Sequence, residues 1–235
     1  MNGIPTAADF AAARVTNPGQ SEVVRQRLYD YQLYATAGAQ QLSFFQQPIG
    51  SGLTTAAGAA AGAAKTQWDT NMSLGGQLPS GVQYLAESIE VHFYPGSVST
   101  ANTYTTVTAT FFAAAAAATV GGALNDVQSF YNSGMLELNV LSKNYLREAP
   151  LICFPPKSWY ALSAAVASNS ATVGEVGSGV NKADGRPYYL EPRVLLQPAV
   201  NFEVLLRWPA AVATPSGFNS RVGVIIDGYM MRASQ

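Results

Sequence analysis

The sequence is poor in charged residues, in cysteine and in histidine. Only 11% of its 235 residues are Asp, Glu, Lys or Arg, against about 25% in an ordinary soluble domain. A monomer with so neutral a surface would be poorly protected against association. The simplest explanation is that much of this surface contacts other copies of the same chain, so the composition favours a subunit of an assembly.

Net charge is also lacking, because 13 basic residues are balanced by 14 acidic ones. This balance provides no long-range field towards nucleic acid or anionic lipid. The basic residues are spread along the chain, and Arg25 and Arg27 form the only notable local pair. Because that is too little for a nucleic-acid-binding arm, we expect no strong direct binding of nucleic acid.

The chain also has few residues of the types that bind metal ions, which limits the kinds of site that it can form. Cys153 is the single cysteine, which excludes a disulfide within the chain. It lies in the apolar segment 151–154, which predicts a short buried strand and an inert, buried thiol. With one Cys, one His and 14 scattered carboxylates, we expect no zinc site and no cofactor, and a calcium ion between subunits would leave no signal in the sequence.

No apolar run is long enough to predict a transmembrane helix,. In residues 1–20 no charged segment precedes a sustained apolar one, as a secretory signal would require. We therefore expect the protein to be made and used inside a cell or released by lysis. Residues 1–20 are Ala-rich, lack a basic tract and contain the turn signal Asn17-Pro18-Gly19,, which predicts an N-terminal arm.

Short segments in which apolar and polar residues alternate predict β-strands. In the clearest, residues 84–94, Ile89, Val91 and Phe93 are expected on one face. The further strand candidates are residues 28–35, 41–46, 71–78, 104–112, 136–140, 151–154, 193–197, 201–208 and 221–232. In the last of these, residues 224–226 are continuously apolar, which indicates a strand covered on both faces.

Helical signals are few. Residues 21–27 could form a helical turn with Ser21 as its N-cap,. The alanine run 113–118 favours a helix, Gly121-Gly122 is expected to break it, and residues 123–131 predict a short amphipathic helix that ends near Gly134.

Two segments have the composition of insertions. Residues 50–65 are nearly all Gly, Ala, Ser and Thr, and residues 173–186 are Gly-rich and polar. We expect the first to be a long loop or arm that lies on another surface and the second to be an exposed loop. Residues 158–167 favour no single structure.

These segments amount to about eight to ten strands without helix–strand alternation, which argues against a doubly wound α/β fold. The sequence predicts an all-β fold, an antiparallel two-sheet sandwich that is jelly-roll-like, with long loops and one or two short helices. After the arm 1–20, a single domain is expected over residues 21–235, with insertions at about 50–65 and 173–186.

The candidates for catalysis are sparse. His92 is the only histidine, and Glu90 shares its face of the expected strand,. The two could form an orienting pair for a distant Ser, but no Gly-x-Ser-x-Gly motif supports this, and a solvated or interface histidine at a sheet edge is the favoured interpretation. The Gly-rich segment 174–179 has the wrong order for a phosphate loop.

The carboxylates and aromatic residues of the chain are compatible with the hydrolysis or the binding of sugars. The carboxylates available for glycoside hydrolysis are Glu87, Glu90, Glu191 and Glu203,. Carbohydrate-binding sandwiches are often as rich in aromatic residues as this chain, with its 12 tyrosines and with Trp68, Trp159 and Trp208. We favour the interpretation that these rings fill the core and the subunit contacts, and we expect no enzymatic activity.

A family resemblance follows from the whole chain. An arm without a charge cluster leads into the aromatic segments 28–34 and 43–45, long Ala/Gly/Thr insertions follow, and the apolar segments 201–208 and 224–229 close the chain. In this pattern the chain resembles small bacteriophage coat proteins of the jelly-roll type. The basic arm that is frequent in that family is missing here, which again speaks against direct genome binding.

The resemblance implies a capsid subunit that self-assembles with other copies and with other virion proteins, is assembled in the host cytoplasm and is located in the virion. The alternative is a carbohydrate- or receptor-binding β-sandwich, such as a spike, a fibre or a lectin-like module. Exposed aromatic residues clustered beside a carboxylate would favour binding. Apolar patches on opposite edges would favour a shell, because a closed shell needs more than one contact surface.

Overall fold

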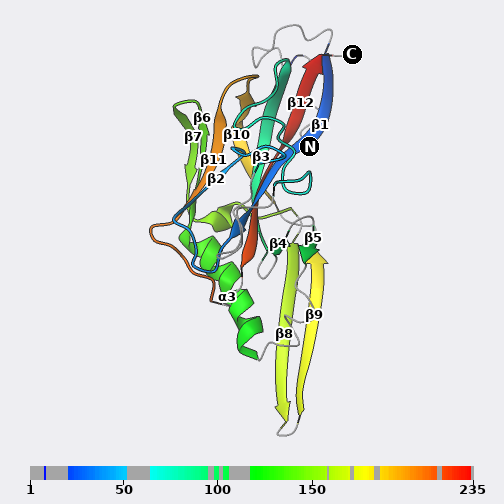
Figure 1. The fold of residues 1–235 in the computed structure, drawn as a ribbon, viewed down its shortest axis with the longest axis vertical. Coiled ribbons are helices and arrows are strands. Elements are labelled where there is room, and N and C mark those ends of the chain that lie inside the picture. The colour runs from blue at the N-terminus through cyan, green and yellow to red at the C-terminus, as the bar shows by residue number, and fades with distance from the viewer. Residues whose placement is uncertain are drawn as a thin grey trace.

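The protein is a sandwich of two four-stranded antiparallel sheets, as the computed structural model shows (Figure 1). The structure describes residues 8, 21–51, 64–94, 98–100, 103–105, 117–157, 159–169, 172–182, 186–215 and 219–233. The first sheet contains, in spatial order, β1 (Ser21–Tyr34), β12 (Ser220–Ala233), β3 (Val82–Tyr94) and β10 (Tyr188–Leu196). The second contains β2 (Gln41–Phe44), β11 (Phe202–Arg207), β6 (Met135–Val140) and β7 (Lys143–Glu148). The predicted all-β two-sheet sandwich is therefore confirmed.

The order of these eight strands is that of a jelly roll. In the order of the chain the first strand pairs with the eighth, the second with the seventh, the third with the sixth and the fourth with the fifth. This is the pattern that results when a long antiparallel hairpin rolls up into two sheets. The smaller elements are inserted between these eight strands.

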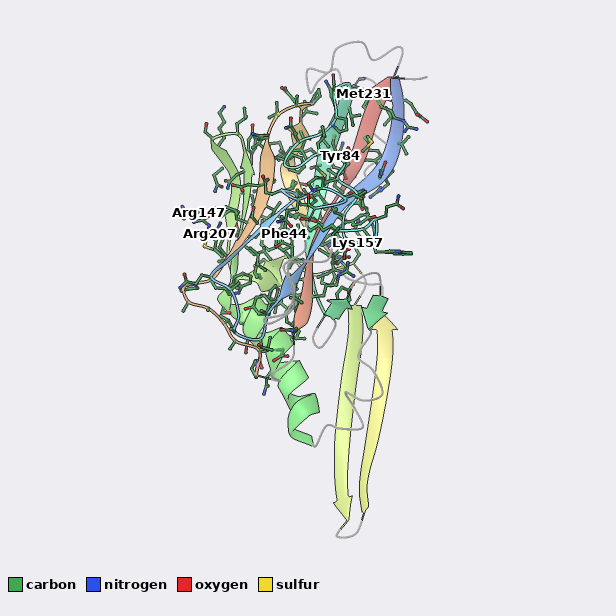
Figure 2. All side chains as sticks on the ribbon, viewed as in Figure 1. Phe44, Tyr84, Arg147, Lys157, Arg207 and Met231 are labelled. Atoms are coloured by element: carbon green, nitrogen blue, oxygen red, sulfur yellow. The ribbon has the colours of Figure 1, made fainter. Side chains whose placement is uncertain are left out.

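The core lies between the two sheets. Alternate residues of each strand point inwards, as period-2 patterning requires, and Ile89, Val91 and Phe93 on β3 are all buried. Phe44 of the short strand β2 is completely buried, and Figure 2 places its side chain between the sheets. The alternation in residues 84–94 therefore predicted the inward face of β3 correctly.

Helix α3 (Ala117–Ser133) closes one end of the sandwich. Its Phe130 is 1% exposed and stacks on Phe93 with ring centroids 4.3 Å apart. The helix runs through Gly121 and Gly122, so the expected break there was wrong. Two glycines destabilise a helix by about 2 kcal/mol together, and we attribute the continuity to the packing of the C-terminal half, around Phe130, against the core.

The inserted strands form two separate hairpins. Strands β4 (Val98–Thr100) and β5 (Thr103–Thr105) pair with each other, as do β8 (Trp159–Asn169) and β9 (Thr172–Lys182). The expectation that 173–186 is an exposed loop was therefore wrong over most of its length. A Gly-rich, polar segment becomes a strand here because β8 provides an 11-residue partner, whereas the sequence pattern reflects only local preference.

Three further expectations were wrong. Residues 21–27 belong to β1 rather than to a helical turn, because the whole segment pairs with β12 up to Ala233. Residues 151–154 form the 3-10 helix η2 (Leu151–Cys153) instead of a strand. With three residues per turn, this helix buries Leu151 and Phe154 on one side and leaves Cys153 exposed,, so the expected buried thiol was also wrong.

Some expectations concern parts of the chain that the structure does not describe. Apart from residue 8, the arm 1–20 lies outside the described residues, and so do residues 52–63 of the expected loop 50–65. Of the strand candidate 104–112, only residues 104 and 105 are described, in β5. In the described ranges no helix combines the length and the apolar character needed to cross a bilayer.

Candidate functional site

The outer face of the first sheet carries a group of charged residues around buried carboxylates, which we call the Asp227 cluster. Its members come from β1, β3, β10, β12 and the segment after η2, and they are Arg25, Arg27, Glu87, Glu90, His92, Lys157, Arg193 and Asp227. The strand register explains the gathering, because Arg27, Asp227 and Ser88 are direct neighbours across three strands.

Asp227 lies at the centre of this cluster and is 2% exposed. Arg25 donates a hydrogen bond from Nη2 to Oδ2 of Asp227 at 3.1 Å, Lys157 Nζ donates to the same oxygen, and Arg27 Nε is 3.8 Å away. Burial alone would raise the pKa of the Asp227 carboxyl, but the hydrogen bonds from Lys157 and Arg25 outweigh it and hold the pKa below its usual value,. Asp227 is therefore ionised and neutralised by cations from two elements.

Glu90 and His92 form the second part of the cluster. Glu90 is 1% exposed, its Oε2 accepts the backbone N–H of Lys157 at 2.6 Å, and Nε2 of His92 lies 3.4 Å from the same oxygen. Burial acts to raise the pKa of Glu90, yet His92 and Lys157 together lower it,. Glu90 and His92 thus share one face of β3, as their spacing predicts, and their side chains lie in contact.

The surroundings of His92 differ from the favoured expectation of a solvated histidine. The residue is only 9% exposed, and Nδ1 is 2.9 Å from the hydroxyl of Tyr94. The Tyr31 ring packs edge-on against it at 6.4 Å, and this ring fits only because residue 223 is Gly: a Cβ there would lie 2.1 Å from a Tyr31 carbon. Both ring nitrogens of His92 therefore face neighbours on its own strand, which makes the histidine a packed structural residue.

The four carboxylates considered for glycoside hydrolysis lie on three strands, β3, β10 and β11. Glu87 is bound by Arg193 at 2.7 Å, while Glu90 is held by His92 and Lys157. Glu191 lies on β10 and Glu203 on β11, in different sheets. Glu87 and Glu90 are thus each engaged by a basic partner on the outer face of the first sheet.

A smaller charged group lies on the opposite outer face. Glu137 of β6 is 4% exposed and lies 3.2 Å from Arg147 Nε and 3.4 Å from Arg207 Nε. Figure 2 shows Arg147 and Arg207 side by side on this face and Lys157 on the other side of the sandwich. Ion pairs thus cross neighbouring strands on both outer faces.

Buried ion pairs gave little signal in the sequence, and the most deeply buried of those described joins Lys65 and Asp30. Lys65 Nζ lies 2.6 Å from Oδ1 of Asp30, both side chains are fully buried, and the other Asp30 oxygen accepts the backbone N–H of Phe45 at 2.7 Å. The backbone N–H of Lys65 also donates to the carbonyl of Ser51, so the two ends of segment 52–63 are held together on the sandwich. A lysine at the end of a low-complexity stretch was the only signal in the sequence.

The most distinctive surface element is the hairpin of β8 and β9, which we call the ribbon. Its two 11-residue strands pair with each other and with no other described strand. Figure 1 shows it extending away from both sheets at the end where α3 lies. Its strands contain only two charged residues, Glu175 and Lys182, among mainly Ala, Ser, Gly and Val.

Exposed apolar side chains occur on several parts of the described surface. The large ones are Ile49, Trp68, Leu74, Leu141, Tyr145, Ile152 and Tyr189. Of the tryptophans, Trp68 is 71% exposed and Trp208 is buried in the core, while the side chain of Trp159 lies outside the description. Aromatic residues thus serve both the core and the surface.

The described side chains include no group of three or more His, Cys, Asp or Glu placed to hold a metal ion.

Comparison with protein-family models, with curated proteins and with solved structures finds no match. The function must therefore be argued from the fold and its surfaces.

Proposed function

We propose that this chain is a structural subunit that self-assembles into the shell of a virus or phage particle, with other copies of itself as its main partners. The ribbon is the observation that carries the proposal. An isolated two-stranded hairpin is marginally stable at best in water, and this one projects from the sandwich with two charges in 22 residues. A neighbouring subunit would supply the surface that such an element needs.

The sandwich is suited to form part of the wall of a shell. Jelly rolls form capsid domains as well as lectin domains, and fold alone does not decide between them. In this chain the Asp227 cluster ties β1, β3, β10 and β12 together on one face, and Glu137 with its two arginines ties β6, β7 and β11 on the other. Ion pairs between strands on both faces would make the sandwich rigid, so that it keeps its shape when neighbouring subunits contact it.

The surface chemistry supports repeated contacts between copies. Charged residues make up 11% of the chain, so repulsion between copies is weak. Exposed apolar side chains lie on separate elements, for example Leu74, Leu141 and Ile152, which provides the several contact surfaces that a closed shell needs. Other virion proteins would bind to the same kinds of surface, and the virion would be the location of the assembled protein.

The arm 1–20 is proposed as a second contact element. It stays a prediction from the sequence. Deletion of residues 1–20 should leave the sandwich folded, as judged by circular dichroism, and should weaken assembly. Unchanged particle formation by the shortened chain would remove the arm from the proposal.

The proposal is tested by the mass of the purified native protein, measured by light scattering and checked by negative-stain microscopy. We expect closed particles of megadalton mass. The matched variant replaces residues 161–180 with a short Gly/Ser turn, which removes the ribbon and leaves the sandwich, and it should give a small species. A full-length chain that remains monomeric or trimeric at high concentration would contradict the proposal.

A further inference from the structure

A groove lies where edge strands of the two sheets approach each other. It has a volume of about 450 Å³ and is lined by Tyr145 and Leu146 of β7 and by residues 188–194 of β10. β7 is the last strand of one sheet and β10 the last strand of the other. The volume falls within the range of about 300–1,000 Å³ that is typical of small-molecule sites.

Both strands are irregular at this groove. On β7 the pairing with β6 passes from Leu146 to Asn144, so that Tyr145 has no partner opposite it. On β10 the pairing with β3 passes from Tyr189 to Val194, which leaves residues 190–193 outside the regular ladder. Bulges of this kind redirect side chains and are frequent next to binding sites. Here two of them flank the same cavity.

The side chains at the groove are aromatic and accessible. Tyr145 is 52% exposed and Tyr189 is 58% exposed, whereas Tyr188 packs on Phe154 with ring centroids 4.8 Å apart. An exposed tyrosine offers a flat apolar ring together with a polar hydroxyl, and it loses little conformational entropy on binding because it has only two side-chain torsions. A ligand with one apolar face and several hydroxyl groups matches this surface.

The charge of the groove narrows the class of ligand. The guanidinium of Arg193 is already bound to Glu87 at 2.7 Å, so it provides little attraction for an anion. Glu191 is exposed in the groove wall, and its carboxylate accepts hydrogen bonds from hydroxyl groups and repels other carboxylates.

We propose that this groove binds a neutral glycan, with a pyranose ring stacked on Tyr145 or Tyr189 and its hydroxyl groups donating to Glu191. The inference is independent of assembly: a shell subunit with such a groove would recognise surface sugars, and a subunit of another kind would bind them equally. The proposal concerns binding alone.

The test is saturation-transfer NMR on the full chain, titrated separately with maltose, cellobiose, lactose and chitobiose. At least one of the four sugars should bind saturably. Of Tyr145→Ala and Tyr189→Ala, the variant that removes the stacking ring should weaken that binding by about tenfold or more, as loss of a stacked aromatic anchor does. Trp68→Ala is the matched control, since it removes an exposed aromatic residue outside the groove, and it should leave binding unchanged.

The role of Glu191 has its own test in the same assay. A sialylated lactose should bind more weakly than lactose, and Glu191→Gln should reduce that difference. Thermal melts of all variants establish that they fold, which exposed positions should permit. Absence of saturable binding by all four sugars at millimolar concentration would overturn the proposal, as would unchanged affinity in both tyrosine variants. Neither result depends on the mass of the particle, so the assembly proposal would be unaffected.

Discussion

The sandwich and the ribbon are both β-structures, but they are stabilised in different ways. Strands β3, β11, β12 and β6 each pair with two neighbours and contribute to one apolar core. β8 and β9 pair only with each other among the described strands. The strands of the sandwich thus have pairing partners and a core within the chain, whereas no described strand outside the ribbon pairs with β8 or β9.

The largest effect is expected from a charge placed in the core. Phe93→Asp puts a carboxylate where the native ring stacks on Phe130 at 4.3 Å and is 8% exposed. An unpaired buried charge costs several kcal/mol or more, a large fraction of the stability of a typical domain. Circular dichroism should show no folded sandwich. A soluble variant with a native spectrum would show that the core assignment is wrong.

The buried ion pair should give the next largest effect. Lys65→Met leaves Asp30 without its cation in a fully buried position, and loss of one partner of such a pair costs about 3–5 kcal/mol. The free energy of unfolding in urea measures this loss. Asp30→Asn in the same chain should recover part of it, because burial raises the pKa of that carboxyl and the amide carries no charge.

Arg232→Ala is the control for this pair. It breaks the exposed ion pair with Glu22 at 2.8 Å, and exposed pairs contribute about 0–1 kcal/mol. Equal losses in Lys65→Met and Arg232→Ala would contradict the account of the buried pair.

Acid should destabilise the sandwich through the Asp227 cluster. The pKa values of Asp227 and Glu90 are lowered in the folded protein, so their stabilising contribution is complete above the ordinary carboxyl pKa and is lost as the pH falls through the folded values. The urea midpoint should therefore fall as the pH is lowered from about 5 to about 2. Asp227→Asn should show a shallower fall, and Glu22→Gln, at an exposed site, should match the native protein. An identical pH dependence in all three proteins would refute the assignment.

The smallest effect on folding should come from removal of the ribbon. Replacement of residues 161–180 with a short turn removes the contacts that β8 and β9 make with each other. It also shortens the connection between two parts of the sandwich, and the entropic cost of closing such a connection changes little with its length. The melting temperature of the sandwich, measured at a concentration where the chain is dissociated, should stay within a few degrees of the native value. A collapse of the melting temperature would mean that the ribbon supports the sandwich from within.

The sequence allowed the sandwich to be predicted because its strands alternate. Ile89, Val91 and Phe93 lie on the core face as expected, and the apolar run at 224–226 is covered on both faces, with Ile225 only 6% exposed on the outer side. This alternation reflects burial on one face, which a single sequence records directly.

The rest depended on long-range contacts that no local pattern contains. The strand character of residues 172–182 comes from pairing with β8. The ion pair of Lys65 joins residues 35 positions apart, and the groove arises from irregular pairing on β7 and β10. Glu90 and His92 were placed on one face correctly because same-face spacing is local. The burial of His92 under Tyr31, however, depends on Gly223, which is far away in the sequence and lies opposite His92 on β12.

The most direct test of the central claim is amide hydrogen exchange in the ribbon, followed at low and high protein concentration with β12 as the internal reference. If neighbouring copies cover the ribbon, residues 159–169 and 172–182 should exchange rapidly in the dissociated chain and nearly as slowly as β12 in the assembled protein. Rapid exchange in the ribbon at every concentration, with β12 protected throughout, would contradict the proposal that this element joins copies of the chain.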